Sequence, residues 1–367
     1  MIECRNLSKS YGNVQAVIRI SLRLCDYEFL SILGPSGCGK STLLRLIAGL
    51  EVPSQGKVFL HGQEISGSKI ILPPEHRKFG MIFQDFALFP HLSVNDNVRY
   101  GASGSKKEKH KRVHELLELV GLPHLAQKFP HQISGGEQQR IALARALAPR
   151  PSLILMDEPF SNLDYQLRQQ LRSDIKEILE HEGVATVLVT HDQVEAITFS
   201  DRMLLMQNGE IVQAGTPSEI YQRPQTIWAS SFVGEANHLM VEWQNEYLQT
   251  PFGALNVHSE IAKKASILMV RPEDFKIESV PVEQANGIVK SVNFSGATQK
   301  VCIALQIGTI VQVNCSPNLL WIRNDAVKIS AERYICFDNS GNRLNGIPEQ
   351  KIKEEKNSYL NSPEIKV

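Results

Sequence analysis

The sequence predicts an α/β domain built on a mainly parallel sheet, followed by a smaller domain made of short strands. Three observations support this fold class. Strand-like apolar runs alternate with helical patterns over residues 1–235, a glycine-rich loop joins one of these strands to a helix, and short β-like segments then replace the helical patterns. Alternating strands and helices are typical of a parallel sheet with helices packed on it. A chain of 367 residues also favours two or three domains over one.

The first part of the chain is expected to hold four strands and one helix. The strands are expected at residues 1–7, 28–33, 56–62 and 79–84. The helix is expected at residues 39–50, where apolar residues recur at helical spacing and Gly49 stands near the end. The middle of the chain continues the alternation, with further helices at residues 105–128, 138–148 and 163–182 and strands at 152–158 and 185–191. The basic run KKEKHKR that opens the first of these helices is interpreted as a solvated face.

Beyond residue 235 the β-like segments are HLMVEW, ASILMV, GIVKSVNF, KVCIALQI, TIVQVN and DAVKIS. Gly, Pro, Asn and Asp separate them, which predicts a small β-barrel or sandwich. The expected domains are therefore residues 1–235, with a helical subdomain at about 88–150, and a β-rich domain at 236–345. Residues 346–367 are expected to form a polar, frayed tail.

The composition excludes several classes of protein. Lys and Arg number 39, as do Asp and Glu, so bulk charge gives no support to nucleic-acid binding. No apolar run approaches the roughly 20 residues that span a bilayer, and the first residues lack the apolar core of a signal peptide. We therefore expect a cytoplasmic protein whose membrane contact is made through a partner. The six cysteines include no C-x-x-C pair, so neither a zinc site nor a disulfide framework is indicated.

The glycine-rich loop GPSGCGKST follows the strand FLSIL and matches the pattern G-x-x-x-x-G-K-[ST]. Glycines let backbone N–H groups converge on phosphate oxygens, and a helix N-terminus adds partial positive charge. Lys40 is expected to reach the β- and γ-phosphates, and Ser41 to ligate Mg²⁺. The alternative is a simple turn between strand and helix. The candidate nucleotide-binding residues here are Gly34, Pro35, Ser36, Gly37, Cys38, Gly39, Lys40, Ser41 and Thr42. Cys38 is interpreted as filling a variable position and not as a redox group.

A second element is the apolar strand SLILMDEP, which ends in two acids. Burying two carboxylates is costly, so both are expected at the exposed tip of the strand. Asp157 is then placed to hold Mg²⁺, directly or through water, and Glu158 to act as general base on the water that attacks the γ-phosphate. On their own, two acids at a strand end are as readily explained as surface residues.

The third element, ISGGEQQRIALARAL, resembles the signature sequence of ATP-binding cassette (ABC) proteins. Serine and two glycines before a helix make a second phosphate-binding N-terminus. The resemblance implies that Ser134, Gly135, Gly136 and Glu137 of one subunit close over the ATP held by the glycine loop of another. The sequence departs from the family pattern at Ile133, where leucine is usual, and at Glu137, where glutamine is usual.

The same resemblance implies roles for four further residues. Tyr11 resembles the aromatic residue that stacks on adenine, and Gln84 the glutamine that senses Mg²⁺ and the attacking water. Asp164 resembles the acid that links the two sites of the dimer, and His191 the switch histidine that contacts the γ-phosphate. Without the other motifs, this tyrosine and histidine are better explained as surface or structural residues. The implied cofactors are ATP and Mg²⁺, the latter held by Ser41, Gln84 and Asp157, and the implied catalytic residues are Glu158, His191 and Gln84.

The β-rich remainder resembles the accessory domain of importer ATPases, and the residues Arg271, Pro272, Glu273 and Asp274 carry that resemblance. Taken alone, RPED is equally a turn that opens a short helix. The resemblance implies a homodimer that closes on two ATP molecules, drives two permease subunits, and serves a solute-binding protein indirectly. It would lie at the cytoplasmic face of the inner membrane. Phe86, Leu88 and Phe89 are expected either to contact the permease or to pack in the core.

No residue of this chain would touch the transported solute, so side-chain chemistry does not identify it. Asp85 and the stretch GEAN at 234–237 look more like ferric-iron importer ATPases than those for other solutes. Import of polyamine, sulfate or thiosulfate, or sugar is the alternative. A soluble ABC ATPase acting on nucleic acid or ribosomes is a competing class, which the neutral charge and the β-rich part disfavour. The presence of Glu158 and His191 disfavours a purely regulatory ATP-binding protein.

Overall fold

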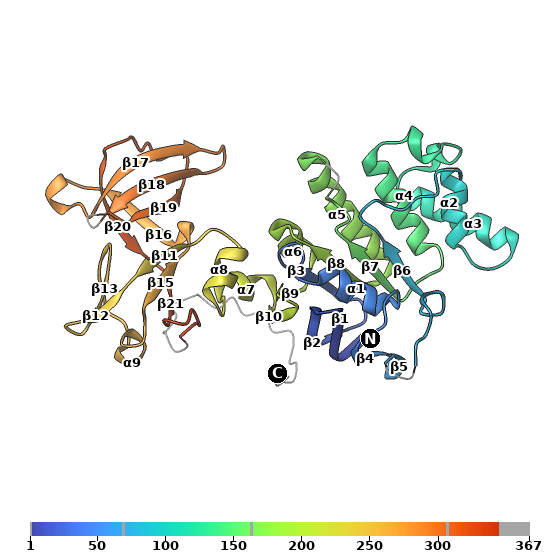
Figure 1. Ribbon diagram of the computed structural model, residues 1–367. Helices are drawn as coiled ribbons and strands as arrows, with labels where there is room; N and C mark the ends of the chain where they lie inside the picture. The colour runs from blue at the N-terminus through green and yellow to red at the C-terminus, as the bar shows by residue number, and fades with distance from the viewer. Residues whose placement is uncertain (1, 68–69, 162–163, 306–307, 345–367) are drawn as a thin grey trace, which may run out of the picture. The chain divides into compact units, whose positions relative to one another are not determined.

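The computed structural model describes residues 2–67, 70–161, 164–305 and 308–344 (Figure 1). The expected polar tail at 346–367 lies outside the described residues. The chain forms two compact units, one comprising residues 1–224 and 232–234, the other 225–231 and 235 onward. A boundary at 235/236 therefore stays a prediction, because the short segment 225–231 groups with the second unit.

The first unit contains a six-stranded sheet in the order β10-β9-β3-β8-β7-β6. Its strands are β3 (Phe29–Leu33), β6 (Phe79–Ile82), β7 (Leu153–Asp157), β8 (Ala185–Thr190), β9 (Arg202–Gln207) and β10 (Glu210–Gly215). All neighbouring pairs are parallel except β10 with β9. Every residue of β3, β7 and β8 is buried, as expected for central parallel strands covered on both faces. The predicted mainly parallel sheet is thus confirmed.

Alternate residues of the sheet strands enter two different hydrophobic clusters. Leu30 and Leu155 pack with helix α1 (Lys40–Ala48) and the four-stranded antiparallel sheet β2-β1-β4-β5. Phe29 and Ile154 point into the other cluster. The strands of the smaller sheet are β1 (Ile2–Tyr11), β2 (Val14–Leu24), β4 (Gln55–Leu60) and β5 (Gln63–Ser66). The other cluster draws on helices α2 (Val94–Gly101), α3 (Lys106–Leu119), α4 (Gly135–Leu147), α5 (Tyr165–Glu182) and α6 (Gln193–Phe199). The period-2 alternation of the strands therefore places helices on both faces of the sheet.

The helical region is less continuous than the sequence predicted. The helix expected at 105–128 ends at Leu119, and a short 3₁₀ turn, η2 (Pro123–Leu125), follows. Gly121 explains the break, because its φ of 76° is the left-handed conformation that ends a helix, and Pro123 then lacks the N–H with which a helix would continue. Two further short elements, η1 (Pro74–His76) and η3 (Pro130–Gln132), also begin with proline. The first unit closes with helix α7 (Pro217–Gln222).

The second unit consists mainly of antiparallel strands in three sheets, ordered β11-β15-β21, β12-β13-β14 and β16-β20-β17-β18-β19. The strands are β11 (Asn237–Met240), β12 (Glu242–Gln244), β13 (Tyr247–Thr250), β14 (Gly253–Leu255), β15 (Ile267–Val270), β16 (Phe275–Ser279), β17 (Gly287–Phe294), β18 (Gln299–Leu305), β19 (Ile310–Cys315), β20 (Ala326–Ala331) and β21 (Ile335–Phe337). Its helices are α8 (Ile227–Phe232) and α9 (Ser259–Ala262), with 3₁₀ turns η4 (Pro272–Asp274) and η5 (Val282–Gln284). One cluster of buried residues draws on all three sheets. The small β-rich domain predicted by the sequence is confirmed, and its strands pair antiparallel.

Two details of this unit differ from, or refine, the sequence interpretation. HLMVEW is not a single strand, because it divides between β11 and β12, which belong to different sheets. RPED does form a turn that opens a short 3₁₀ helix, η4. Arg271 is 3% exposed and donates to the carbonyls of Ser230 and Glu235 at 2.8 and 2.9 Å. This buried arginine therefore fixes the segment around α8 to the β sheets of the same unit.

Candidate nucleotide site

The glycine loop runs from the end of β3 to the start of α1 (Figure 1). Two of its glycines lie against other strands. A Cβ atom on Gly34 would stand 2.2 Å from the carbonyl oxygen of Met206, and one on Gly39 would stand 2.0 Å from that of Ala16. Gly39 also has a φ of 103°, which disfavours any L side chain. The motif therefore needs glycine at these positions for two reasons: the loop packs closely against neighbouring strands, and its backbone must approach phosphate closely.

Lys40 begins helix α1 and is 4% exposed. Its Nζ donates to the carbonyl oxygens of Gly34 and Pro35 at 2.8 and 2.9 Å. An ammonium has three donors, so these bonds leave one for an anion held in the loop. Ser36 and Gly37 are exposed, whereas Cys38 is buried. Burial raises the pKa of the Cys38 thiol, which disfavours the reactive thiolate and agrees with a packing role.

A hydroxyl and a carboxylate meet at the start of α1. Ser41 Oγ donates to Asp157 Oδ1 at 2.7 Å, although the two residues lie 116 positions apart. Asp157 is the last residue of β7 and is 8% exposed. Burial raises the pKa of its carboxyl, and the hydrogen bond from Ser41 opposes that shift. Two hard oxygen ligands side by side at a phosphate loop fit Mg²⁺, which is bound in such sites by one or two protein oxygens together with phosphates and water.

Glu158 follows β7 directly, and His191 follows β8 directly. The Glu158 carboxylate Oε2 lies 2.9 Å from His191 Nδ1. An ionised carboxylate only accepts hydrogen bonds, so Nδ1 of His191 is the donor in this contact. Glu158 has a φ of 47°, a left-handed conformation unusual for a non-glycine residue. Its N–H donates to the carbonyl of Val189 at 2.9 Å, which ties this turn to β8.

These groups share one edge of the sheet. Strands β3, β8, β7 and β6 are consecutive neighbours, and the chain leaves them at Gly34, His191, Glu158 and Phe83 respectively. Gln84 is exposed and comes two residues after the end of β6. The carboxyl edge of a parallel sheet is where such folds bind ligands. The structure thus brings the loop, both acids and the histidine together, with Gln84 at the same edge.

The signature residues lie at the start of helix α4. Ser134 is the N-cap: its hydroxyl accepts from the N–H of Glu137, and the Glu137 carboxylate accepts from the N–H of Ser134 at 2.7 Å. The hydrogen bonds that this carboxylate accepts from the N–H and the hydroxyl of Ser134 lower the pKa of Glu137. Glutamate at this departure from the family pattern therefore completes a capping box. Among the described residues, no hydrogen bond or ion pair joins this helix start to the glycine loop of the same chain.

Two other predicted residues lie outside this cluster of contacts. Tyr11 ends β1 with its side chain 45% exposed, and Lys9 Nζ lies 4.9 Å from its ring centroid. Asp164 is the N-cap of α5 and accepts from the N–H of Leu167 at 3.0 Å. Both remain available for contacts beyond the chain. The residues 162–163 of the SNLD stretch lie outside the described residues.

The apolar residues after Gln84 differ in burial, and a permease contact of any of them stays a prediction. Phe86 is 5% exposed and belongs to the core, so it does not contribute to a surface patch. Leu88 is half-buried and packs against the same core, and Phe89 is half-buried. The sequence did not identify Arg145 of helix α4, whose side chain donates to carbonyls of the segment after Gln84. A single arginine inside a helical pattern carries no spacing signal that would have identified it.

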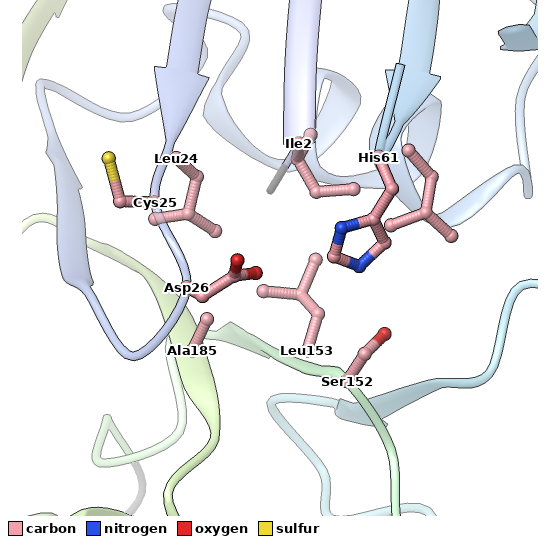
Figure 2. A pocket seen from close by; sticks show the side chains of 9 residues that line it. Ile2, Leu24, Cys25, Asp26, His61, Ser152, Leu153 and Ala185 are labelled. Atoms are coloured by element: carbon pink, nitrogen blue, oxygen red, sulfur yellow. The ribbon is translucent and has the colours of Figure 1, made fainter. Parts of the chain in front are cut away.

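A small pocket lies at the other ends of the same strands (Figure 2). Leu153 and Ala185, the first residues of β7 and β8, line it together with Asp26 and His61. Because it opens at the amino ends of the strands, it is separate from the edge that carries Glu158.

Within the described parts of the chain, no group of three or more His, Cys, Asp or Glu side chains is arranged to hold a metal ion. No helix in those parts is long and apolar enough to cross a membrane.

Comparisons with known proteins agree with this geometry. A family model described as ABC transporter matches residues 17–161, and one described as TOBE domain matches residues 268–337. The Fe(3+) ions import ATP-binding protein of Pseudomonas fluorescens is 41% identical over 308 residues, covering 83% of this chain and 87% of that protein. The spermidine/putrescine import ATP-binding protein of Lawsonia intracellularis is 39% identical over 330 residues, covering 85% and 89%.

A solved structure of a dimeric ATP-binding cassette, in a post-hydrolysis state bound to ADP and Pi, is 33% identical with a TM-score of 0.52. It covers 59% of this chain, and the match spans 99% of that structure. The glycine loop, the acids at the end of β7 and the capped signature helix are thus found in a chain whose two parts match two known domains in order. The chain belongs to the ATP-binding proteins of ABC transporters.

Proposed function

We propose that this chain is the ATP-hydrolysing subunit of a bacterial importer, and that the imported solute is ferric iron. The observation that carries the ATPase assignment is the arrangement of four side chains at one sheet edge. Ser41 bonded to Asp157 makes a cation site beside the phosphate loop. Glu158 in contact with His191 makes a base beside it.

Some residues of the chain bind ATP and Mg²⁺, and others take the proton of the attacking water. The amides of the glycine loop and Nζ of Lys40 bind the phosphates of ATP. Ser41 and Asp157, with Gln84, would hold Mg²⁺, which neutralises charge on the β- and γ-phosphates when bound. Glu158 takes the proton from the attacking water, a general-base contribution on the order of 10²- to 10⁴-fold. His191 orients the Glu158 carboxylate through Nδ1–H, and Nε2–H of the doubly protonated ring would donate to a γ-phosphate oxygen.

A complete site needs a second copy of the chain. The start of α4 offers free backbone donors beside Ser134, and within the described residues these do not bond to the glycine loop of their own chain. We propose that two copies pair head to tail, each presenting its signature helix to the ATP of the other. The solved ATP-binding cassette at 33% identity is dimeric, which supports pairing of two copies. The same pairing would act on two integral membrane permease subunits at the cytoplasmic face of the inner membrane.

The solute assignment depends on relatives. Fe(3+) import proteins of Pseudomonas fluorescens and Pectobacterium atrosepticum are 41% and 42% identical. A spermidine/putrescine import protein at 39% identity supports polyamine import as the second candidate. The β-rich unit matches a TOBE domain, which supports an accessory role for it. A solute-binding protein would serve the same transporter without touching this chain.

Uptake measurements test the assignment. Cells that lack this chain should lose uptake of labelled ferric iron under iron limitation, while uptake of labelled spermidine is unchanged. The wild-type chain should restore uptake, and Glu158→Gln should not, because transport would require hydrolysis. Loss of spermidine uptake with normal iron uptake would replace the iron assignment with the polyamine one. Normal uptake of both solutes, together with ATPase activity in vitro, would overturn both solute assignments.

A further inference from the structure

Arg145 holds the turn that follows Gln84. It lies in the last turn of α4, and its two terminal guanidinium nitrogens donate to successive carbonyls. The bond to Ala87 is 2.6 Å and the bond to Phe86 is 2.9 Å. The guanidinium also lies over the ring of Phe89, with its carbon 5.4 Å from the ring centroid. Three of the five residues that follow Gln84 and Asp85 are therefore in contact with one side chain.

The turn needs such support. Phe86 has a φ of 61° and Ala87 a φ of 46°, so two successive non-glycine residues have left-handed backbone. This conformation is unfavourable for L-residues and persists only where surrounding contacts impose it. The Phe86 side chain is buried and its N–H donates to the carbonyl of Phe83 at 2.9 Å. Arg145 supplies the remaining constraint by binding both carbonyls of the pair.

The chemistry of this contact suits arginine. A guanidinium presents several donors in a planar fork, and so can bind two neighbouring carbonyls at once, whereas lysine carries its donors on a single nitrogen. Arg145 is half-buried, and this burial lowers its pKa. Among the described residues it forms no ion pair with a carboxylate. A half-buried cation whose hydrogen bonds go to backbone carbonyls, with an aromatic ring as its other neighbour, gives up part of its hydration without a counter-charge, which argues that its position has a purpose beyond packing.

The rest of the segment is fixed to the same group of helices. Asn97 on α2 is fully buried, accepts from the N–H of Phe89 at 2.9 Å, and donates to the carbonyls of Phe89, Leu92 and Ser93. Helices α2 and α4 are in contact. Residues 86–93 are thus attached to the helices, whereas β6 is a strand of the main sheet. Gln84 lies between these two attachments.

We propose that Arg145 is a positioning residue for Gln84. By fixing the turn at Phe86 and Ala87 to α4, it makes the place of Gln84 depend on the place of that helix. Helix α4 begins at the signature residues, and about ten residues of helix span roughly 15 Å between Gly135 and Arg145. A helix displaced by ATP bound at its start would therefore carry Gln84 with it. The inference rests on the proposed function, and on the proposed role of Gln84 at the Mg²⁺ and water site.

The test is a double-mutant cycle in the full-length chain, with kcat and KM for MgATP as the measurements. Arg145→Gln removes the charge and the fork, and Arg145→Lys keeps the charge alone. Arg140→Gln is the matched control, because Arg140 lies on the same helix and also donates to a carbonyl, that of Val120, and to Asp174. Each is made in the wild-type and Gln84→Ala backgrounds. Thermal melting is recorded for every variant.

We expect Arg145→Gln to lower kcat about tenfold to a hundredfold while KM changes less than about twofold, since misplacing a catalytic group acts on turnover. Arg145→Lys should lose less. In the Gln84→Ala background, Arg145→Gln should lower kcat by less than about twofold more, because the residue it positions is already absent. Arg140→Gln should keep kcat near that of the wild type.

Three results would overturn the proposal. The same fold-loss from Arg145→Gln in both backgrounds would show that it does not act through Gln84. A kcat for Gln84→Ala equal to that of the wild type would show that Gln84 has no role in turnover, so that Arg145 could not act by positioning it. Equal losses of kcat and of melting temperature in the Arg145 and Arg140 variants would reduce Arg145 to a structural role. The proposed ATPase function is judged separately, by whether wild-type turnover exists and is lost in Glu158→Gln.

Discussion

The carboxylate of Glu158 lies 2.9 Å from Nδ1 of His191, although the two residues are 33 positions apart in the chain. Each follows the last residue of a buried strand, β7 or β8, and these strands are parallel neighbours. The contact is thus produced by the sheet and not by any local turn. The Glu158 side chain is 19% exposed, and the His191 side chain that contacts and orients it is 51% exposed.

Glu158→Gln should separate binding from turnover. The amide cannot take a proton from water, so we expect ATPase activity to fall on the order of 10²-fold or more. ATP affinity should be retained, since the phosphate contacts of the loop are untouched. The closed, ATP-bound dimer should accumulate, which size-exclusion chromatography with ATP would detect. Turnover close to that of the wild type would remove Glu158 from the role of base.

Lys40→Ala should act at the binding step instead. The variant deletes a buried ammonium held by the carbonyls of Gly34 and Pro35. We expect a large rise in the Kd for ATP, measured by equilibrium binding of a fluorescent ATP analogue, because a phosphate contact is lost. Retained affinity with lost turnover would show that Lys40 acts only in the transition state. Lys57→Ala, in strand β4 and paired with Glu64, is a control for removing a lysine elsewhere in the cassette.

Asp157→Asn should stabilise the nucleotide-free chain at neutral pH. Burial is the main cause of the raised pKa of Asp157, so the folded state holds its proton more tightly than the unfolded state does. The ionised carboxylate therefore opposes folding increasingly as the pH rises above the ordinary value of 3.8. We expect the Tm of Asp157→Asn to exceed that of the wild type at about pH 7, and the difference to shrink as the pH falls towards that ordinary value.

The same variant should show the opposite behaviour towards the metal. Removing a negative oxygen from the site should raise the Mg²⁺ concentration needed for half-maximal ATPase activity. An unchanged Mg²⁺ requirement would contradict the assignment of Asp157 to the metal. An equal or lower Tm at neutral pH would contradict the stated effect of burial. For the melting temperature, Ser41→Ala is the control: it removes a hydrogen-bond donor and leaves the buried charge in place, so it should not raise the Tm.

A fragment containing residues 1–224 should fold and bind ATP. All the nucleotide motifs lie within it, and helix α8 is excluded. A fragment ending at 235 should bind ATP but be less soluble, because Ala229 and Ser230 of α8 are buried in the full chain. In that chain Ile227 donates to the carbonyl of Gly341, a bond that the longer fragment lacks. Isothermal titration with ATP and light scattering would check both statements. A folded 1–224 fragment without affinity for ATP would show that the second unit helps to build the site.

Several features of the fold could be predicted because their causes are local. The strand FLSIL, followed by the motif glycines Gly34 and Gly39 and then by Lys40 and Ser41, predicts a strand, a phosphate loop and a helix. LILMD followed by Glu158 reads as a buried strand with acids at its tip. Strand β2 was not predicted, although its residues alternate, and HLMVEW was predicted as one strand. Sequence alone does not show where a strand changes partner, and pairing partners such as β11 with β15 lie about 30 residues apart.

The sequence by itself determined which chemical groups are present and in what order, because strand and helix periods, glycine spacing and capping residues act within a few positions. Only the tertiary structure decided which of those groups meet. Ser41 reaches Asp157, His191 reaches Glu158, and Arg145 reaches the carbonyls of Phe86 and Ala87 across 116, 33, 59 and 58 positions. Such contacts depend on the order of strands in the sheet and on helix packing, which bring distant segments together without leaving any regular spacing in the chain.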